Sequence, residues 1–129
     1  MNRLRRTALG ILFTLCAAPG VAHHSAAMFD SQKSLTLRGT IKEFQWVNPH
    51  CWIQLLVREQ NATVEWSIEM GSTVQIYRSG WRPSSVLPGQ KVTIVIHPIR
   101  DGSRGGQFSS GVGEDGAPLG AKGNGPTTS

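Results

Sequence analysis

The sequence predicts an all-β fold with one short helix, arranged as a small five-stranded OB-like barrel. Residues 33–98 contain four runs rich in β-branched and aromatic residues, and several of these runs alternate in polarity. A segment bounded by Ser72 and Gly80 lies between the third and fourth runs and predicts a helix. Three strands, a helix and two strands is the element order of an OB fold. A five-stranded sandwich is the alternative.

The first 22 residues carry the pattern of a cleavable export signal. Met1–Arg6 includes three arginines, Ala8–Ala18 is almost wholly apolar, and small residues precede a cut after Ala22. The apolar stretch of about 11 residues is well short of the ~20 that a spanning helix needs, so no stable membrane anchor is expected. The paired arginines loosely fit a twin-arginine signal, although a Sec signal is favoured. We therefore expect a periplasmic or secreted protein.

The excess of basic residues belongs partly to this signal. The chain has a formal net charge of +5, but removal of residues 1–22 leaves ten basic and eight acidic residues, a balance of +2. No basic cluster remains in the processed sequence, so no nucleic-acid partner is expected. Cys51 is then the single cysteine, which excludes an internal disulfide and predicts a buried structural thiol.

The processed chain divides into three parts. An extended N-terminal arm is expected at residues 23–32, the OB-like domain at residues 33–112, and a disordered Gly/Pro-rich tail at residues 113–129. The first strand of the domain starts near Lys33 and alternates in polarity to Glu43, and Phe44 and Trp46 continue the β-rich composition. Asn48-Pro49 then interrupts it, because proline cannot donate to a ladder.

The remaining elements follow from composition. Residues 51–57 and 63–69 predict the second and third strands of an antiparallel meander, joined by a turn. An N-cap at Ser72 and a stop at Gly80 predict the helix. Residues 91–97 form a β-branched fourth strand, and residues 107–112 a poor last strand after a Gly-rich loop.

Four histidines follow the signal and form a candidate metal set: His23, His24, His50 and His97. A cut after Ala22 makes His23 the first residue, and its amine (reference pKa ~8) and imidazole can chelate Cu(II), which favours nitrogen ligands. A cut one residue earlier places a histidine third, which is also a copper- or nickel-binding arrangement. In the alternative interpretation the pair is only a solvated arm, and His50 and His97 satisfy buried carbonyls at strand ends.

A second candidate site consists of Trp46, Asn48 and Trp52, which flank the interruption between the first two strands. OB folds often stack ligands on such aromatic side chains, although core positions for these tryptophans are an equally good expectation. Glu65 and Glu69 on the third strand are ~13 Å apart, too far for a glycosidase pair, and are expected to be solvated. No catalytic triad or phosphate-binding loop is recognisable, so an enzyme is not expected.

An ordered series of short motifs resembles a known family. The motifs are His23-His24-Ser25, Phe29-Asp30, Gly39-Thr40-Ile41, Phe44-Gln45-Trp46, Asn48-Pro49-His50, Glu65-Trp66, Gly80-Trp81, Pro88-Gly89, His97-Pro98 and Arg100-Asp101-Gly102. On these residues the chain resembles the small exported bacterial proteins of domain of unknown function family 6152. The resemblance implies export and a small β-barrel with a clear last strand, whereas residues 108–113 are glycine-rich here. The family brings no established activity.

The sequence therefore predicts an exported, non-catalytic binding module. The leading hypothesis is that its partner is a metal ion, copper, held by the N-terminal histidines. The alternative is a small molecule, glycan or periplasmic partner protein held in the aromatic groove.

Overall fold

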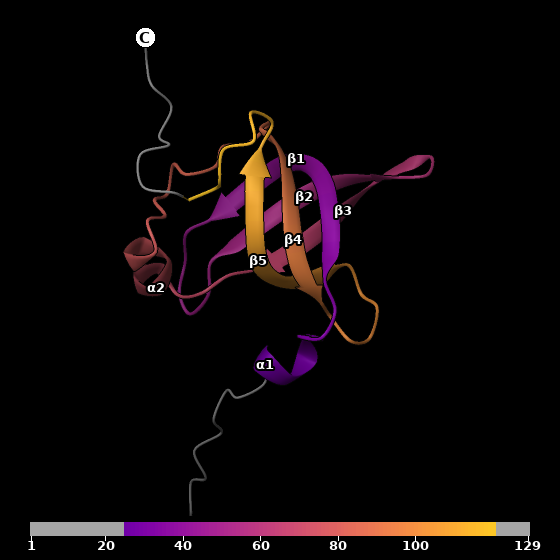
Figure 1. Cartoon of the computed structure of the whole chain (residues 1–129), viewed down its shortest axis with the longest axis horizontal. Helices are drawn as coiled ribbons and strands as arrows, with labels where there is room; N and C mark the ends of the chain where they lie inside the picture. The colour runs from indigo at the N-terminus through magenta and orange to yellow at the C-terminus, as the bar shows by residue number, and fades with distance from the viewer. Residues whose placement is uncertain (1–24, 121–129) are drawn as a thin grey trace, which may run out of the picture.

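The computed structural model describes residues 25–120, and their strands close into a barrel. The elements in chain order are α1 (Ser25–Met28), β1 (Leu35–Gln45), β2 (Trp52–Glu59), β3 (Ala62–Glu69), α2 (Thr73–Arg78), β4 (Lys91–Pro98) and β5 (Gly105–Gly113). Around the barrel the strand order is β1-β2-β3-β5-β4 (Figure 1). The mostly β class, the short helix between β3 and β4 and the OB-like barrel are thereby confirmed. No helix among these residues has the length and apolar character needed to cross a membrane.

β1 is the longest strand and pairs with two neighbouring strands. Its first half pairs with β4 and its second half with β2, both antiparallel. The register with β2 shifts between Ile41 and Glu43, and such an irregularity changes which of the following side chains face inward. Leu37 and Ile41 are buried before the shift, whereas after it the even-numbered Phe44 packs against the core. Simple alternation along the strand would have placed Phe44 outside.

The interior of the barrel is filled by branched aliphatic side chains from all strands except β5. The six large ones that are at most 1% exposed are Ile41, Ile53, Leu55, Ile68, Ile94 and Ile96. Trp81, just after α2, is 5% exposed. Its ring centroid lies 5.8 Å from that of Phe44 and 5.3 Å from that of Phe108. Trp81 therefore links β1 and β5 through ring contacts.

α2 begins where the capping signal predicts. The Ser72 hydroxyl accepts the Gln75 backbone N–H at 3.3 Å, and the Gln75 side chain accepts the Ser72 backbone N–H at 2.9 Å. This reciprocal capping box satisfies two donors that the first helical turn would otherwise leave unpaired. Ile76 is the buried residue of the helix and joins the core cluster.

The described residues of the N-terminal arm are not simply extended. Residues 25–28 form the helical turn α1, and Phe29 is 3% exposed and forms a bridge with Ile99. The Asp30 N–H donates to the Pro98 carbonyl at 2.8 Å. Burial of one aromatic ring thus fixes this segment against the end of β4. Residues 1–24, including the expected signal and both N-terminal histidines, lie outside the described residues.

The start of the predicted disordered tail is also ordered. Residues 114–120 turn back after β5, and the Leu119 N–H donates to the Gly111 carbonyl at 2.9 Å. Leu119 packs against the core, and Gly120 lies so close to the Trp81 ring that no Cβ would fit. Composition alone missed these contacts because the segment offers only one large apolar side chain. Residues 121–129 lie outside the described residues.

A close approach at Gly39 leads to the first prediction. Gly39 on β1 pairs with Val57 of β2 and Val92 of β4, and a Cβ there would collide with the Leu56 carbonyl oxygen. The obstacle is backbone, so a methyl group forces the strands to shift. Gly39→Ala is expected to lower the free energy of unfolding by about 1–3 kcal/mol, the usual cost of overpacking, as measured by urea denaturation.

The matched control is Thr36→Ala on the exposed part of the same strand. That change should alter the unfolding free energy by no more than about 0.5 kcal/mol. Equal stability of the Gly39→Ala protein and the parent would contradict the close packing described here.

Candidate functional site

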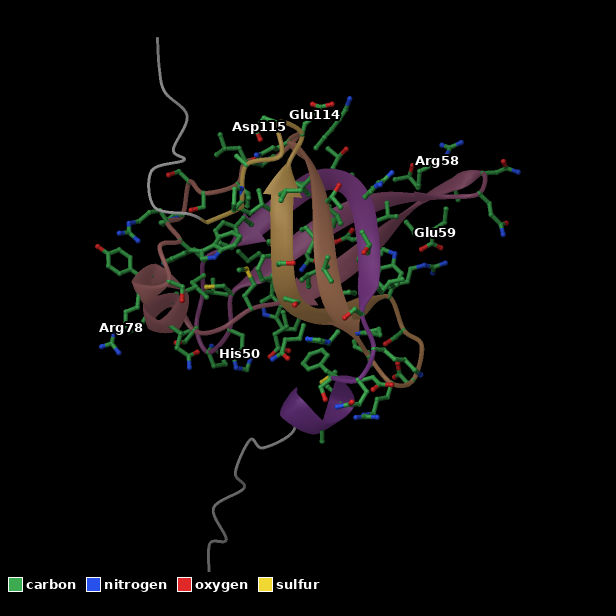
Figure 2. All side chains as sticks on the ribbon, in the orientation of Figure 1. His50, Arg58, Glu59, Arg78, Glu114 and Asp115 are labelled. Atoms are coloured by element: carbon green, nitrogen blue, oxygen red, sulfur yellow. The ribbon has the colours of Figure 1, made fainter. Side chains whose placement is uncertain are left out.

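Strand register brings several polar residues to one end of the barrel. Trp52 pairs with Glu69, Glu69 pairs with Gln107, and Gln107 pairs with His97, so β2, β3, β5 and β4 share this row. His50 lies two residues before β2 and reaches the same end, where α1 also lies (Figure 2). We name this end the histidine rim and define it by His50, Glu69, His97 and Gln107.

His50 is held by a buried carboxylate. Its Nδ1 lies 2.8 Å from Glu69 Oε1, and the two side chains are 35% and 7% exposed, respectively. Backbone bonds from Cys51 N to the Gly71 carbonyl and from Met70 N to the Cys51 carbonyl continue the β2–β3 ladder and fix this position. A carboxylate only accepts, so Nδ1 donates the proton and Nε2 remains for another partner. The expectation that Glu69 is solvated is wrong, because its side chain is only 7% exposed and pairs with the His50 ring.

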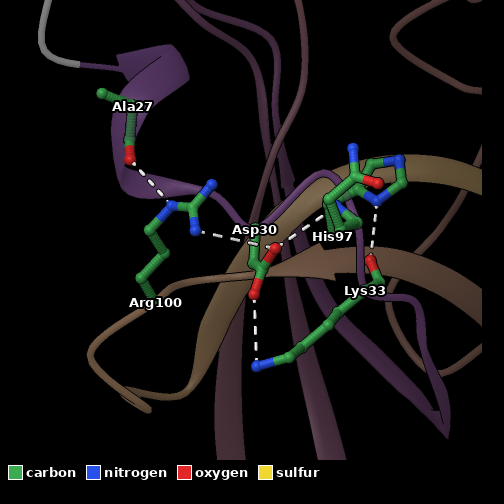
Figure 3. A network of polar contacts seen from close by, with 6 residues as sticks. Ala27, Asp30, Lys33, His97 and Arg100 are labelled. Carbon is green, nitrogen blue, oxygen red and sulfur yellow. Dashed lines mark hydrogen bonds and ion pairs between the residues drawn. The ribbon is translucent and has the colours of Figure 1, made fainter.

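His97 is oriented in the same way by a different acceptor. Its Nδ1 lies 2.8 Å from the Lys33 carbonyl oxygen (Figure 3). A carbonyl oxygen can only accept, so the proton sits on Nδ1 and the neutral ring presents its lone pair at Nε2. In both rim histidines, Nε2 is therefore the nitrogen that can bind a ligand.

A polar network anchors the start of the described chain beside His97. The Asp30 carboxylate lies 3.2 Å from Lys33 Nζ and 3.7 Å from Arg100 Nη1. Arg100 Nε donates to the Ala27 carbonyl at 3.2 Å, and the Arg100 backbone N–H donates to the Met28 carbonyl at 2.9 Å (Figure 3). The side-chain hydrogen bond from Lys33, helped by the Gln32 backbone N–H and the Arg100 charge, holds the pKa of Asp30 below its ordinary value of 3.8.

A pocket of about 460 Å³ opens beside His50. Its polar lining comes from His50, Glu69, Gln75, Ser79 and Gln107, and its apolar lining from Met70, Ile76, Trp81 and Phe108 together with Gly71. The lining contains no lysine or arginine. Mixed polar and aromatic walls of this size are typical of sites for small organic ligands.

The residues of the predicted aromatic site do not line this pocket. Trp46 is half-buried against the core, with its ring centroid 5.8 Å from that of Phe44. Asn48 Oδ1 accepts from Thr73 N at 3.1 Å and Thr73 Oγ1 at 2.9 Å, so this side chain supports the first turn of α2. Trp52 is half-buried on β2, opposite Glu69. None of the three belongs to the residues that line the pocket beside His50.

The structure describes only two of the four histidines that form the candidate metal set. His50 and His97 lie at the same end of the barrel, whereas His23 and His24 lie outside the described residues. Within residues 25–120 no group of three or more His, Cys, Asp or Glu side chains could hold a metal ion. Cys51 is fully buried, donates from Sγ to the Val47 carbonyl at 3.5 Å and has its pKa raised by burial, which fits a structural thiol.

Sequence reasoning missed Glu69, Gln107, Trp81 and Phe108 as site residues. A usable signal existed for Glu69, because pairing the second and third strands through their short turn sets its position opposite residue 52, next to His50. No comparable signal exists for Gln107 or Phe108. Their place depends on how the last strand closes the barrel.

The Asp30 network predicts an acid-sensitive anchor. A carboxyl group whose folded-state pKa is lowered stabilises the fold above its unfolded pKa of about 3.9 and loses that contribution as pH falls through the folded value. Stability of the parent should therefore decline as pH drops below about 4, and Asp30→Asn should lower Tm at neutral pH and flatten this decline. Thermal unfolding followed from about pH 7 to about pH 2 measures both effects.

Asp101→Asn is the matched comparison, because hydrogen bonds from Ser103 lower the pKa of Asp101 in an exposed loop. Only Asp30→Asn should speed hydrogen exchange of the Asp30 and Lys33 amides. Parallel pH curves for the parent and Asp30→Asn would refute the anchoring role.

Comparison with known proteins gives one match. The model of a family of unknown function (DUF6152) matches residues 12–108, more than half of the chain. No curated protein and no solved structure matches the chain. The resemblance inferred from the ordered motifs is thus confirmed, and the chain belongs to this family of unknown function.

Proposed function

We propose that this protein is an exported, non-catalytic binding module whose ligand is a copper ion at the histidine rim. In this proposal the export signal at residues 1–22 is removed after Ala22. The new terminal amine and the His23 ring then chelate Cu(II), and His24, His50 and His97 are the candidates for the remaining nitrogen ligands.

The observation that carries the proposal is the matched orientation of the two rim histidines. Each Nδ1 donates to an oxygen acceptor, Glu69 Oε1 for His50 and the Lys33 carbonyl for His97, at 2.8 Å in both cases. Histidines that bind metals through Nε2 almost always donate the other N–H to a carboxylate or carbonyl in this way, which fixes the ring and raises its basicity.

The covalent reach of the arm supports the same site. Phe29 forms a bridge with Ile99, two residues beyond His97, and Arg100 bonds to the α1 carbonyls. In this proposal six residues of chain, at most about 22 Å when fully extended, connect His23 to Phe29. That reach is compatible with N-terminal donors at the end of the barrel that carries both rim histidines.

The aromatic-groove alternative has less support. Asn48 is engaged by Thr73, and the Trp46 ring packs toward the core, so two of its three residues already have structural partners. Small-molecule binding is better supported in the pocket beside His50, which is lined by the aromatic residues Trp81 and Phe108.

The arm is tested by calorimetric titration of correctly processed protein with Cu(II). Two variants remove the chelate: one with Gly-Ser added before His23, and one with His23→Ala and His24→Ala together. Both should bind at least about tenfold more weakly, because the first displaces the amine and the second removes the imidazoles. Affinity of the parent should also fall as pH is lowered from about 8 to about 5, since protonated nitrogens cannot ligate.

Glu65→Gln serves as the control, because this carboxylate is exposed, pairs with Lys42 and lies on β3 about 13 Å along the strand from Glu69. It should leave copper affinity unchanged. Equal affinity in all four proteins, or no binding tighter than about 10 μM, would reject the copper site.

The rim ligands are tested separately with His50→Gln and His97→Gln. Loss of a ligating Nε2 should weaken Cu(II) binding by about tenfold or more and remove one nitrogen coupling from the electron paramagnetic resonance spectrum of the bound ion. A full set of nitrogen couplings in both variants would exclude the rim histidines as ligands and leave only the arm.

A further inference from the structure

We propose that the pocket beside His50 binds a small organic cation, an ammonium group on a short aliphatic chain, by pairing it with the Glu69 carboxylate against the Trp81 and Phe108 rings. This site is separate from the copper site of the proposed function. It uses residues of the folded barrel alone and needs neither His23 nor His24.

Glu69 supplies the charge. Its side chain is only 7% exposed, and Oε1 receives the His50 N–H at 2.8 Å. Glu69 also lines the pocket, so its carboxylate is the charged group of the pocket wall. A largely buried carboxylate in the wall of a pocket favours a positively charged occupant.

The walls of the pocket suit the rest of such a ligand. Trp81 and Phe108 meet edge to face, with ring centroids 5.3 Å apart, and both line the pocket. Aromatic rings attract alkylammonium groups through their negative faces. The Met70 thioether and the Ile76 side chain add apolar surface for an aliphatic chain.

Charge balance in the lining points to the same class of ligand. Glu69 is its single carboxylate, and neither lysine nor arginine competes for it among the residues that line the pocket. The amides of Gln75 and Gln107 and the Ser79 hydroxyl can bond a polar group at the far end of the ligand. A pocket of about 460 Å³ is ample for a molecule of this kind.

Choline and its neutral isostere 3,3-dimethylbutan-1-ol provide the test, because they share shape and hydroxyl group and differ only in charge. Titration into the processed protein at constant ionic strength should give a Kd below about 1 mM for choline and binding at least about tenfold weaker for the isostere. Signals of the Met70 and Ile76 methyl groups should shift in nuclear magnetic resonance spectra when choline binds.

Three variants locate the interaction. Glu69→Gln should weaken choline binding about tenfold or more, whereas Glu65→Gln, the exposed carboxylate on the same strand, should leave it unchanged. Phe108→Leu keeps an apolar side chain but removes a ring, and should weaken binding about threefold or more even if Glu69→Gln fails to fold.

These results separate the two proposals. Choline binding that survives the combined His23→Ala and His24→Ala change supports the cation site whatever the copper titration shows. Equal affinity for choline and the isostere, no saturation below about 10 mM, or an equal loss in Glu65→Gln and Glu69→Gln would overturn it.

Discussion

The parallel pairing of β5 with β3 is the constraint on which both the barrel and its histidine rim depend. Only three residue pairs make this contact, Ser67 with Gly105, Ile68 with Gly106 and Glu69 with Gln107. A Cβ at Gly106 would lie 2.6 Å from the His97 carbonyl oxygen and 2.5 Å from Ile96 Cδ1, so the strand can enter only without a side chain. Its entry sets Gln107 between Glu69 and His97 and brings Phe108 against Trp81.

This constraint explains which parts of the fold can be predicted from the sequence. Alternating β-branched residues mark β1 to β4, and Ser72 and Gly80 bound α2, because these signals are local. Glycine lowers the expectation of a strand, yet β5 extends from Gly105 to Gly113, and its entry needs glycine because a side chain at Gly105 or Gly106 would collide with the neighbouring strands. The register shift after Ile41 does leave a trace in the sequence, because Lys42 and Glu43 are consecutive charged residues and the apolar positions move from odd to even numbers at Phe44.

The candidate site likewise contains residues that can be predicted from the sequence and residues that cannot. His50 and His97 can be selected from residue type and from their position at strand ends, and the pairing of β2 with β3 places Glu69 beside His50, but the acceptor of His97 cannot be predicted in this way. The Lys33 carbonyl is 64 residues away from His97 in sequence and meets it only after β1 has paired with β4. Glu69 lies on the polar face of its strand, as expected, and becomes buried because the chain at His50 folds over it. Burial of that kind is a property of tertiary packing and leaves no trace in the local pattern.

Glu69 gives the rim two distinct uses for one carboxylate. Its Oε1 accepts the His50 Nδ1–H, which leaves Nε2 for the proposed metal ion, and the same side chain lines the pocket together with Trp81 and Phe108. A copper ion at Nε2 and an ammonium ion at the carboxylate would each bring positive charge to the same buried group. Under the two proposals, binding of one ion opposes binding of the other, and by linkage each weakens the other by the same factor. The single Glu69 carboxylate would then couple the proposed copper site to the proposed cation site.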